Sequence, residues 1–462
     1  MPGRRLGLLW PFIRRSSALS ESHLSMPQKA AVYDRLASEG VRVARDHPMP
    51  RASRGEVLVN VHCAGVNPVD AKLVFGDKLP AWCGWLPSRA VQGKAVGFDF
   101  AGTVAAAAGG FEAGEEVFGM LPPFGGSFAQ VVSCPATQLA RKPRGLSMRE
   151  AGCLPLGGIT CLQAFDQHGL KGPGQNLLVI GGSGGVGHVA LQVGRRLGCS
   201  GVVAVCSRRN LDLCVRKLGA SAAVAYDTGE TRTQAAAATE RATASTGRAA
   251  AGLVAGDDLV VEALAAWCEE HGPFDLVFDT VTSHDSRDRA SDYPNRLLSR
   301  PGIVRRPSET DGGGAGGADG TVDPHNYVTI GGGTMGWVRA GVKKVLGLNV
   351  FPTGRELFWI TPAYCAPYLE RLAGLCAAPE LPSDLPAETA PESDPARDGA
   401  AAASGDLAGD TPEGGETPAG GGIRPVVAEV LPLTDEGVRR AFALMHGRRT
   451  KGKVVIEVVA AS

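Results

Sequence analysis

The sequence predicts an α/β protein in which a doubly wound parallel sheet stands beside a β-rich domain. Three observations predict this class. Short strand-like runs separated by Gly and Pro fill residues 29–158. From Gln175 onward, short apolar runs alternate with stretches of helical spacing, as in a parallel sheet covered by helices. Strand-like alternation then returns after Ile423, and the 462 residues suffice for two ordinary domains.

The composition excludes several classes of function. The chain is 44% hydrophobic and 20% charged, as soluble globular proteins are. Lys and Arg number 47, as do Asp and Glu, so no basic excess is present to hold a nucleic-acid backbone, and we expect no nucleic-acid partner. We also expect no membrane span, because no apolar run reaches the roughly 18 to 20 residues that a spanning helix needs. The 11 cysteines contain no CxxC pair, which favours reduced thiols over a disulfide framework.

Residues 1–27 are predicted to be a transit peptide rather than part of the fold. They contain Arg4, Arg5, Arg14 and Arg15, and no acidic residue precedes Glu21. This composition is typical of an organelle transit peptide, and a disordered basic tail is the alternative. We therefore expect a mitochondrial protein, with the plastid and the cytoplasm as alternative locations.

The β-rich domain is predicted to begin within residues 28–155. Each of its strand candidates is short, rich in apolar residues and bounded by Gly or Pro, which favours small antiparallel sheets over helices. The candidates are residues 56–66, 97–104, 115–120 and 127–132.

Residues 156–362 are predicted to form the parallel sheet domain. Its first elements alternate as strand, helix, strand and helix, which is the order that builds a doubly wound sheet. These four elements are residues 176–182, 187–197, 201–207 and 211–219. Three further apolar runs continue the sheet, at residues 222–226, 274–281 and 326–332.

Residues 363–462 are predicted to return to the first domain, with strands at 423–433 and 452–459 around a helix at 435–445. Residues 229–252, 308–323 and 379–422 lack the bulky hydrophobic residues of a packed core and are predicted to lie in inserted loops. The predicted loops in the parallel sheet domain span residues 229–252 and 284–323, and the third spans residues 379–422. Partner-binding tails are the alternative reading of these loops.

A glycine-rich turn follows the strand at residues 176–182. Gly182, Gly184 and Gly187 make G-x-G-x-x-G between a strand and a helix, where the first glycine permits a tight turn, the second lets a pyrophosphate approach the main chain and the third lets helix and strand pack closely. Free amides and the helix dipole favour the anion there. If the turn bound no ligand, nothing would explain why a glycine is required at position 184. We expect a Rossmann dinucleotide site formed by Gly182, Ser183, Gly184, Gly185, Val186 and Gly187.

The end of the next strand predicts which dinucleotide binds. NAD sites place an acidic residue there to accept hydrogen bonds from the ribose hydroxyls, whereas this chain has Ser207 and Arg208. A carboxylate would repel a 2′-phosphate, and Ser and Arg can bind it. We therefore expect NADPH as the cofactor, with arginines placed there by chance as the alternative.

The motifs GVNPVDAKL, GFDFAGTV, LPLGGITCLQAF, VIGGSGGVGHVALQ and GKVVIEV occur in the order found in medium-chain dehydrogenase/reductases. Within that superfamily the chain most resembles the zinc-free quinone oxidoreductase (zeta-crystallin-like) branch, and its closing motifs are similar to those of a mitochondrial member. The resemblance covers about residues 29–459 apart from the three loops. It implies a GroES-like catalytic domain made from both chain ends, with the Rossmann domain between, and it leaves a homodimer open.

The resemblance also implies catalytic residues. Asn67 and Asp70, in NPVD, match positions that line the nicotinamide side of the cleft, although a turn stabilised by their side chains is the alternative. Thr160 matches a position beside the nicotinamide, and a buried helix threonine is the alternative.

Further cofactor contacts are implied by the same resemblance. Tyr226 matches an aromatic residue near the adenosine 2′-phosphate. Arg449, Thr450 and Lys451 align with residues that reach back to the cofactor, and exposed basic residues in a loop are the alternative.

Relatives that use zinc carry a histidine ligand in a Gly-His-Glu segment, and here Phe98 takes that position between Gly97 and Asp99. We therefore expect no metal. Without a metal, hydride transfer favours a quinone or an α,β-unsaturated carbonyl, whose conjugated system spreads the developing charge. A 2-enoyl thioester reductase is one alternative, but its expected Tyr proton donor has no candidate between Tyr33 and Tyr226. A non-enzymatic NADPH-binding redox sensor or scaffold is the other.

Overall fold

The fold was obtained as a computed structural model of the chain. It describes residues 27–34, 36–37, 40–70, 92–122, 125–227, 253–254, 257–281, 293–305, 326–331, 334–346, 355–361, 365–377, 422–447 and 450–458. The predicted transit segment up to residue 26 lies outside these residues, as do the predicted loop 229–252 and the loop 379–422 except for Gly422.

One sheet is mixed and combines both ends of the chain. Its strands follow the order β15-β16-β3-β4-β5-β7, with β6 also paired to β3; β15 and β16 are parallel, and the other pairs are antiparallel. Its strands are β3 (Glu56–Gly65), β4 (Asp99–Val104), β5 (Glu116–Met120), β6 (Val131–Pro135), β7 (Leu139–Arg141), β15 (Val427–Pro432) and β16 (Lys453–Glu457). A separate two-stranded antiparallel sheet consists of β1 (Pro27–Tyr33) and β2 (Val41–Pro48), and isolated bridges connect β1 to Ala95 and Ala129, in the segments that precede β4 and β6.

The second sheet is entirely parallel and follows the order β11-β10-β9-β8-β12-β13-β14. Its strands are β8 (Asn176–Ile180), β9 (Gly201–Cys206), β10 (Ala222–Ala225), β11 (Leu253–Val254), β12 (Leu276–Asp279), β13 (Tyr327–Thr329) and β14 (Arg355–Leu357). Every residue of β8 and β9 is buried, as expected for strands that are covered on both faces. The predicted α/β class, with a doubly wound parallel sheet beside a β-rich domain, is therefore confirmed.

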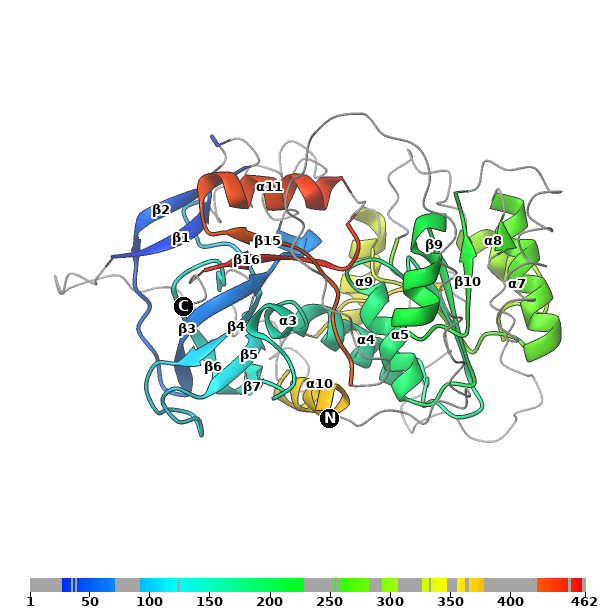
Figure 1. The fold of residues 1–462 in the computed structure, drawn as a ribbon, viewed down its shortest axis with the longest axis horizontal. Coiled ribbons are helices and arrows are strands. Elements are labelled where there is room, and N and C mark those ends of the chain that lie inside the picture. The colour runs from blue at the N-terminus through cyan, green and yellow to red at the C-terminus, as the bar shows by residue number, and fades with distance from the viewer. Residues whose placement is uncertain are drawn as a thin grey trace, which may run out of the picture.

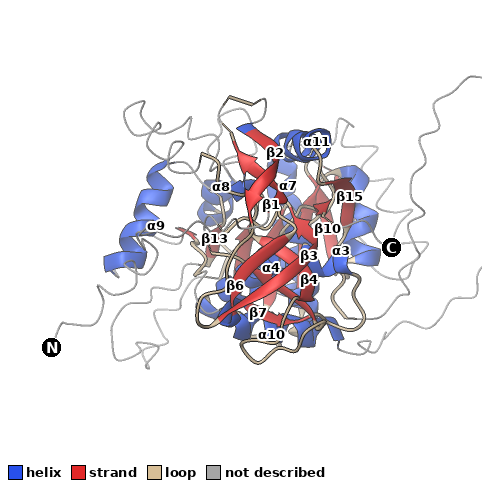
Figure 2. Ribbon diagram, turned by 90° about the vertical axis from the view of Figure 1, so that its left-hand side faces the viewer, coloured by secondary structure: helices blue, strands red, loops and turns tan. Residues whose placement is uncertain are grey.

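Helices cover both sheets and the junction between them (Figure 1). They are α3 (Met148–Gly152), α4 (Pro155–Gln167), α5 (Gly187–Arg196), α7 (Asp257–His271), α8 (Tyr293–Ser299), α9 (Thr334–Leu346), α10 (Ala366–Ala377) and α11 (Asp435–His446), with the short turns η4 (Ala136–Gln138), η5 (Arg208–Asn210) and η6 (Leu213–Lys217). Helix α11 connects the parallel strands β15 and β16, and Figure 2 shows α10 along the edge of the mixed sheet beside β7. None of the described helices is long and apolar enough to cross a membrane.

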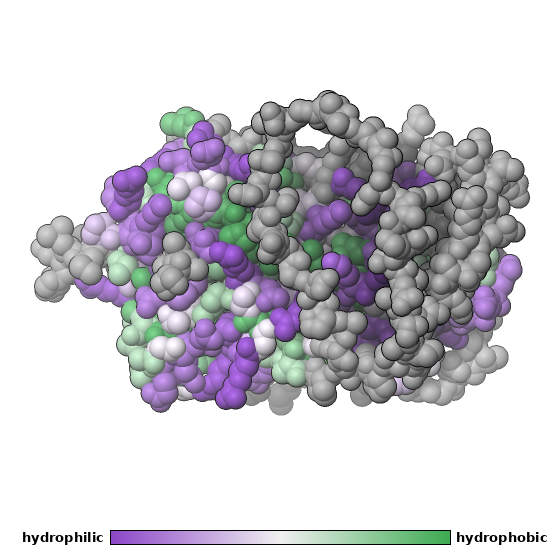
Figure 3. All heavy atoms as spheres, in the orientation of Figure 1, coloured by the Kyte–Doolittle hydropathy of each residue, from purple (hydrophilic) through white to green (hydrophobic). Residues whose placement is uncertain are grey.

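Helix α4 links the two sheets. It starts with Pro155, whose fixed φ suits a first helical turn, and ten of its residues are buried. Gly158 lets α10 approach closely, since an added Cβ would lie 2.3 Å from Leu372 Cδ2. Phe165 packs edge-on against Phe278 of β12, with ring centroids 5.4 Å apart. One hydrophobic cluster therefore runs from the mixed sheet through α4 into the parallel sheet. On the face shown in Figure 3, hydrophilic and hydrophobic residues are intermixed over the half that contains the mixed sheet.

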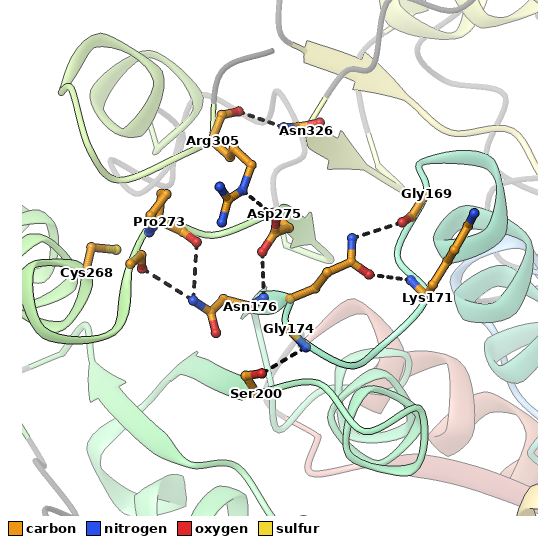
Figure 4. Close-up of polar contacts among 12 residues, drawn as sticks. Gly169, Lys171, Gly174, Asn176, Ser200, Cys268, Pro273, Asp275, Arg305 and Asn326 are labelled. Atoms are coloured by element: carbon orange, nitrogen blue, oxygen red, sulfur yellow. Dashed lines mark hydrogen bonds and ion pairs between the residues drawn. The ribbon is translucent and has the colours of Figure 1, made fainter. Parts of the chain in front are cut away.

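The amino-terminal edge of the parallel sheet is closed by polar contacts (Figure 4). Asn176 begins β8, and its Nδ2 donates to the carbonyl of His271 at 2.9 Å and to the two carbonyls that follow. The amide of Asn176 donates to Asp275, which also pairs with Arg305. Gln175 binds the preceding loop through the amide of Lys171 and the carbonyl of Gly169. This edge is used for structure, so the opposite, carboxyl edge is the one available for a ligand.

The structure differs from the sequence-based expectation in several elements. Residues 213–217, within the predicted helix 211–219, form a π-helix. The strands β1 and β2 and the long helix α7 were not predicted. Residues 293–305, within the predicted loop 284–323, include α8, and Leu297 and Ile303 are buried in the core.

Candidate functional site

The predicted glycine-rich turn lies at the carboxyl end of β8, the central strand of the parallel sheet. A Cβ on Gly182 would lie 2.9 Å from the Cβ of Ala204 in β9, and one on Gly187 would lie 2.1 Å from the carbonyl oxygen of Gly181. On Gly184 it would meet only that same carbonyl oxygen, at 3.2 Å. The first and third glycines are thus required by packing, whereas the second leaves the outside of the turn open to an approaching group.

Sequence reasoning missed a fourth glycine, Gly181. Its φ is +81°, and an added Cβ would lie 2.6 Å from Thr280 Oγ1 and 2.4 Å from Val281 Cγ2. The turn therefore leaves β8 in a left-handed conformation, close to the end of β12. The doubled glycine that follows the apolar run of β8 was the available signal.

The turn presents unused main-chain donors at the start of α5. The amide of Gly184 bonds within the turn, at 2.9 Å from the carbonyl oxygen of Gly181. Within the described chain, the amides of Gly185 and Val186 donate no hydrogen bond outside the helix, and both residues are partly exposed. Unpaired amides at a helix N-terminus attract an anion, so the turn fits the pyrophosphate of a dinucleotide.

The predicted cofactor-binding residues that follow β9 and β10 lie close to one another. Ser207, which follows β9, is buried, while Arg208 beside it is exposed and its amide donates to Asp227 Oδ1 at 2.6 Å. Tyr226 follows the neighbouring strand β10, is 46% exposed, and its amide donates to the carbonyl of Cys206 at 3.1 Å. Ser207, Arg208 and Tyr226 thus stand at one edge of the sheet, beside the glycine-rich turn.

The C-terminal segment reaches the glycine-rich turn, but through residues other than the predicted ones. The amide of Gly452 donates to the carbonyl of Ser183 at 2.9 Å. Thr450 instead donates its hydroxyl to Leu444 at the end of α11, and Lys451 is exposed. Arg449 lies outside the described residues.

Only glycine suits the backbone conformation at position 452. The next residue, Lys453, was missed by sequence reasoning. The φ of Gly452 is +73°, and an added Cβ would lie 2.1 Å from the carbonyl oxygen of Val426. Lys453 follows as the first residue of β16, with its Cδ 3.3 Å from where a Cβ on Gly185 would be. Its side chain is only 3% exposed. The lysine stem therefore passes along the turn into the mixed sheet.

The amino group of Lys453 lies in a buried cluster with Asn67, a predicted catalytic residue, and Asp99. Its Nζ donates to Asn67 Oδ1 and lies 3.7 Å from Asp99 Oδ2, and the Asp99 side chain is fully buried. Asn67 Nδ2 donates to Asp99 Oδ2 at 2.9 Å, and the other Asp99 oxygen accepts from the amide that begins α4 at 2.8 Å. Burial raises the pKa of Asp99, whereas Lys453 and Asn67 lower it. Asn67 is therefore held between a cation and a carboxylate.

Asp70 lies beside this cluster. Its Oδ2 accepts from the amide of Asn67 at 2.7 Å, and its Oδ1 is buried without a partner in the described chain. Burial raises the pKa of Asp70 to about 8, with Asp99 adding to the effect and the Asn67 amide and Lys453 opposing it. Burial thus favours the protonated form of this carboxyl, while its Oδ2 accepts from the main chain of Asn67.

His188, in the first turn of α5, is a second buried titratable group that sequence reasoning missed. Its Nδ1 lies 2.8 Å from the carbonyl oxygen of Gly184, and its Nε2 is buried without a partner among the described residues. Burial lowers the pKa of His188 to about 4, and Lys453 contributes in the same direction. The ring is therefore neutral at pH 7, with Nδ1 donating to the turn.

Thr160 lies on α4, one turn beyond the amide of Leu156 that binds Asp99. It is 8% exposed, and its hydroxyl donates to the carbonyl of Leu156 at 2.6 Å. The structure brings Asn67 and Asp70 together, and it gives the Thr160 hydroxyl a partner within its own helix.

Phe98, which the resemblance sets at the place of a metal ligand, lies in an apolar environment. Phe98 is 6% exposed and packs in the hydrophobic cluster that joins the two sheets. In the part of the chain that the structure describes, no three His, Cys, Asp or Glu side chains gather as a metal site would require. Asp99, the next residue, uses both carboxylate oxygens within the protein.

Comparison with known proteins connects this geometry to a family. Residues 53–144 match the alcohol dehydrogenase GroES-like domain. The chloroplastic quinone-oxidoreductase QR1 of Triphysaria versicolor is 34% identical over 192 residues, which are 40% of this chain and 56% of that protein. The mitochondrial NAD(P)H oxidoreductase RTN4IP1 of Homo sapiens, the reticulon-4-interacting oxidoreductase, is 31% identical over 242 residues, 48% of this chain and 60% of that protein. The chain thus spans little more than half the length of these relatives.

The solved structures extend the likeness in fold to nearly the whole chain. The quinone oxidoreductase from Coxiella burnetii superposes with a TM-score of 0.56 at 18% identity, covering 94% of this chain and 100% of that one. Together with the GroES-like match and the quinone oxidoreductase relatives, this fold confirms the resemblance to the medium-chain dehydrogenase/reductases, in their quinone oxidoreductase branch.

Proposed function

We propose that this chain is an NADPH-dependent, zinc-independent reductase that transfers hydride to a quinone or an α,β-unsaturated carbonyl. The observation that carries the proposal is the glycine-rich turn. On one side, Ser207 and Arg208 stand at the next strand end. On the other, Gly452 binds the turn and Lys453 leads to Asn67 and Asp99. A dinucleotide whose pyrophosphate binds the unpaired amides of Gly185 and Val186 would thus meet Ser207 and Arg208 at its adenosine end. Its nicotinamide end would lie toward Asn67.

NADPH is favoured over NADH by the residues after β9. The position that carries an acid in NAD sites is Ser207, and Arg208 beside it is exposed. The nearby carboxylate of Asp227 already accepts the amide of Arg208, and it follows β10 rather than β9. A serine hydroxyl and a guanidinium are donors, as a 2′-phosphate requires.

The chemistry follows from the apolar metal position and the buried charges. When bound, NADPH supplies the hydride. Lys453 and Asp99 fix Asn67. Asp70 lies beside it, with its Oδ2 accepting from the Asn67 main-chain amide and its pKa raised by burial. Thr160 lies one turn further along α4 than Leu156, and its hydroxyl donates to the carbonyl of Leu156. Phe98 provides no metal ligand, and the described residues form no group that could hold a metal ion, so a conjugated acceptor that spreads its own negative charge is the favoured substrate class.

The experiment is a fluorescence titration of the purified chain with NADPH and NADH, followed by NADPH oxidation with small quinones, an enone and a 2-enoyl thioester. We expect tighter binding of NADPH and turnover of the quinone or enone. Gly184→Val places a side chain on the open side of the turn and should abolish both cofactor interactions. Equal affinity for the two cofactors would contradict the NADPH assignment.

The same assay distinguishes the alternatives. Preferred turnover of the thioester would assign an enoyl thioester reductase, although Tyr33, which reaches this site, is buried and donates its hydroxyl to the carbonyl of Asp70 at 3.3 Å. NADPH binding without turnover of any acceptor would leave a redox sensor or scaffold. Activity that survives dialysis against a strong chelator supports zinc independence, and loss of stoichiometric zinc together with activity would contradict it.

We further propose that residues 1–27 direct the chain to mitochondria. The proposal is supported by their arginine-rich, acid-poor composition and by the mitochondrial RTN4IP1 relative, while the chloroplastic relative keeps the plastid as the alternative. Residues 1–27 fused to a fluorescent protein should co-localise with a mitochondrial marker, and a diffuse signal would refute the proposal. Light scattering on the purified chain tests for a homodimer.

A further inference from the structure

We propose that Asn210 is a positioning residue for NADPH, which turns the hydroxyl protons of Ser183 and Ser207 outward. The inference rests on the proposed function and adds a residue that selects between the two cofactors. Asn210 ends the short turn η5 and is 5% exposed. Its Nδ2 donates to Ser183 Oγ at 2.8 Å and to Ser207 Oγ at 2.9 Å.

The two serines that Asn210 contacts belong to the two segments proposed to bind the phosphates of the cofactor. Ser183 belongs to the glycine-rich turn after β8, and Ser207 follows β9, the neighbouring strand. One amide therefore bridges the turn proposed for the pyrophosphate and the segment proposed for the 2′-phosphate. Both serines are at least nine-tenths buried, with 8% of Ser183 and 7% of Ser207 exposed, so their hydroxyl directions are set by a few neighbours.

Hydrogen-bond chemistry fixes those directions. An amide nitrogen carries two protons and accepts none, so each serine oxygen must accept from Asn210. A hydroxyl has one proton to donate, and in the described chain neither of these two protons has an acceptor. Both remain available to an anion. Asn210 thus converts two ambivalent hydroxyls into two donors.

The other end of the Asn210 amide supports a ligand at this place. Its Oδ1 is buried and has no partner among the described residues. Rotating the amide by half a turn would give Oδ1 two donors from the serines, and both hydroxyl protons would then point inward. In the observed orientation of the Asn210 side chain, Oδ1 and both serine protons have no partner among the described residues. A bound anion that accepts both serine protons would give this orientation a purpose.

The consequence for specificity follows from which cofactor group each serine meets. A pyrophosphate is common to both cofactors, so the direction of the Ser183 hydroxyl affects them equally. Only NADPH carries a 2′-phosphate, which accepts hydrogen bonds and would take the Ser207 proton. A ribose 2′-hydroxyl can donate as well as accept, so NADH depends less on that direction. Disturbing Asn210 should therefore weaken NADPH more than NADH.

The test is Asn210→Asp, which keeps the shape but offers only acceptors and so turns both serine protons inward. Dissociation constants for NADPH and NADH are measured for the wild type, Asn210→Asp, Ser207→Ala and the double variant. We expect each single variant to lower the NADPH-over-NADH preference by about tenfold or more, as loss of one charge-assisted hydrogen bond would. In the double variant, Ser207→Ala should cost no further preference.

The double variant separates orientation from simple repulsion by the new charge. If the carboxylate introduced by Asn210→Asp acted only by repelling the phosphate, the two effects would multiply, and the inference would be overturned. Asn210→Leu is the uncharged control, and it should also lower the preference while thermal melting shows that the chain is folded. A wild type that prefers NADPH, with Asn210 variants that keep the preference, refutes this inference alone. A wild type that binds neither cofactor refutes the proposed function together with it.

Discussion

Replacing Lys453 by Met tests the buried cluster that joins the two sheets. The change keeps most of the apolar stem but removes the only cation that the described structure pairs with Asp99. Both side chains are almost fully buried, at 3% and 0% exposed, so solvent screens the pair little. Breaking one partner of a buried pair costs about 3–5 kcal/mol, because the remaining charge has no compensation.

Asn67 adds to the expected cost, since its Oδ1 also loses the donor that Lys453 supplies. An unpaired buried acceptor costs about 1–3 kcal/mol, and contributions within one network do not add fully. We therefore expect Lys453→Met to lower the free energy of unfolding by about 4 kcal/mol. Natural domains have only about 5–15 kcal/mol in total, so the change should be large in urea unfolding followed by circular dichroism.

Two further variants make this result specific. Lys451→Met removes a charge two residues earlier at an exposed position, and it should change stability by less than about 0.5 kcal/mol. Adding Asp99→Asn to Lys453→Met removes the stranded charge and should recover at least about 2 kcal/mol. If Lys453→Met costs no more than the Lys451 control, or if the double variant is less stable than the single one, the reasoning about a buried ion pair is wrong.

Three other outcomes are expected. The pKa of Asp70 is about 8 in the fold against 3.8 ordinarily, so the native state keeps a proton that the unfolded chain releases; stability should fall as pH rises from about 4 to 8, and Asp70→Asn should flatten that slope in urea titrations at several pH values. Asn176→Leu leaves three carbonyls short of a donor and should cost about 1–3 kcal/mol in thermal unfolding, with the ratio of NADPH to NADH affinity unchanged. Replacing residues 379–421 by a short Gly/Ser link should preserve activity and melting temperature, because Ile423 donates to Leu375 at 3.1 Å and closing a shorter loop costs less, by about 0.6 kcal/mol per halving; loss of folding would contradict it.

The fold could be predicted from the sequence where the pattern is local. Residues 176–180 form an uninterrupted apolar strand followed by glycines, and the stretch from Gly187 has helical spacing, so both elements could be identified without tertiary information. The strand β2 could not, because its burial alternates irregularly against β1 and α11. Helix α7 (Asp257–His271) begins only a few residues after the range 229–252, whose biased composition obscured the start of the helix.

The candidate site could be predicted only in part, because its key contacts join distant residues. Asn67 was identified from a motif, but its partner Lys453 lies 386 positions further along the chain. Spacing carries no information about such a pair. Asp99 was considered only as the neighbour of a missing metal ligand, and its role as the counter-charge of Lys453 required the pairing of β16 with β3. Asn210 was missed for the same reason, since its function depends on two strand ends meeting.

The last strand therefore has a role that its length does not suggest. Gly452 fixes the main chain of the glycine-rich turn through the carbonyl of Ser183, and the next residue, Lys453, fixes Asn67 and Asp99 in the other sheet. Two consecutive residues thus set the distance between the proposed pyrophosphate site and the proposed nicotinamide side. Hydride transfer is sensitive to displacements of about 1 Å, and such precision is best supplied by buried, rigid elements. A chain that ended before β16 would lose this link, so its two halves, even if each were folded, would no longer hold a dinucleotide and its acceptor in register.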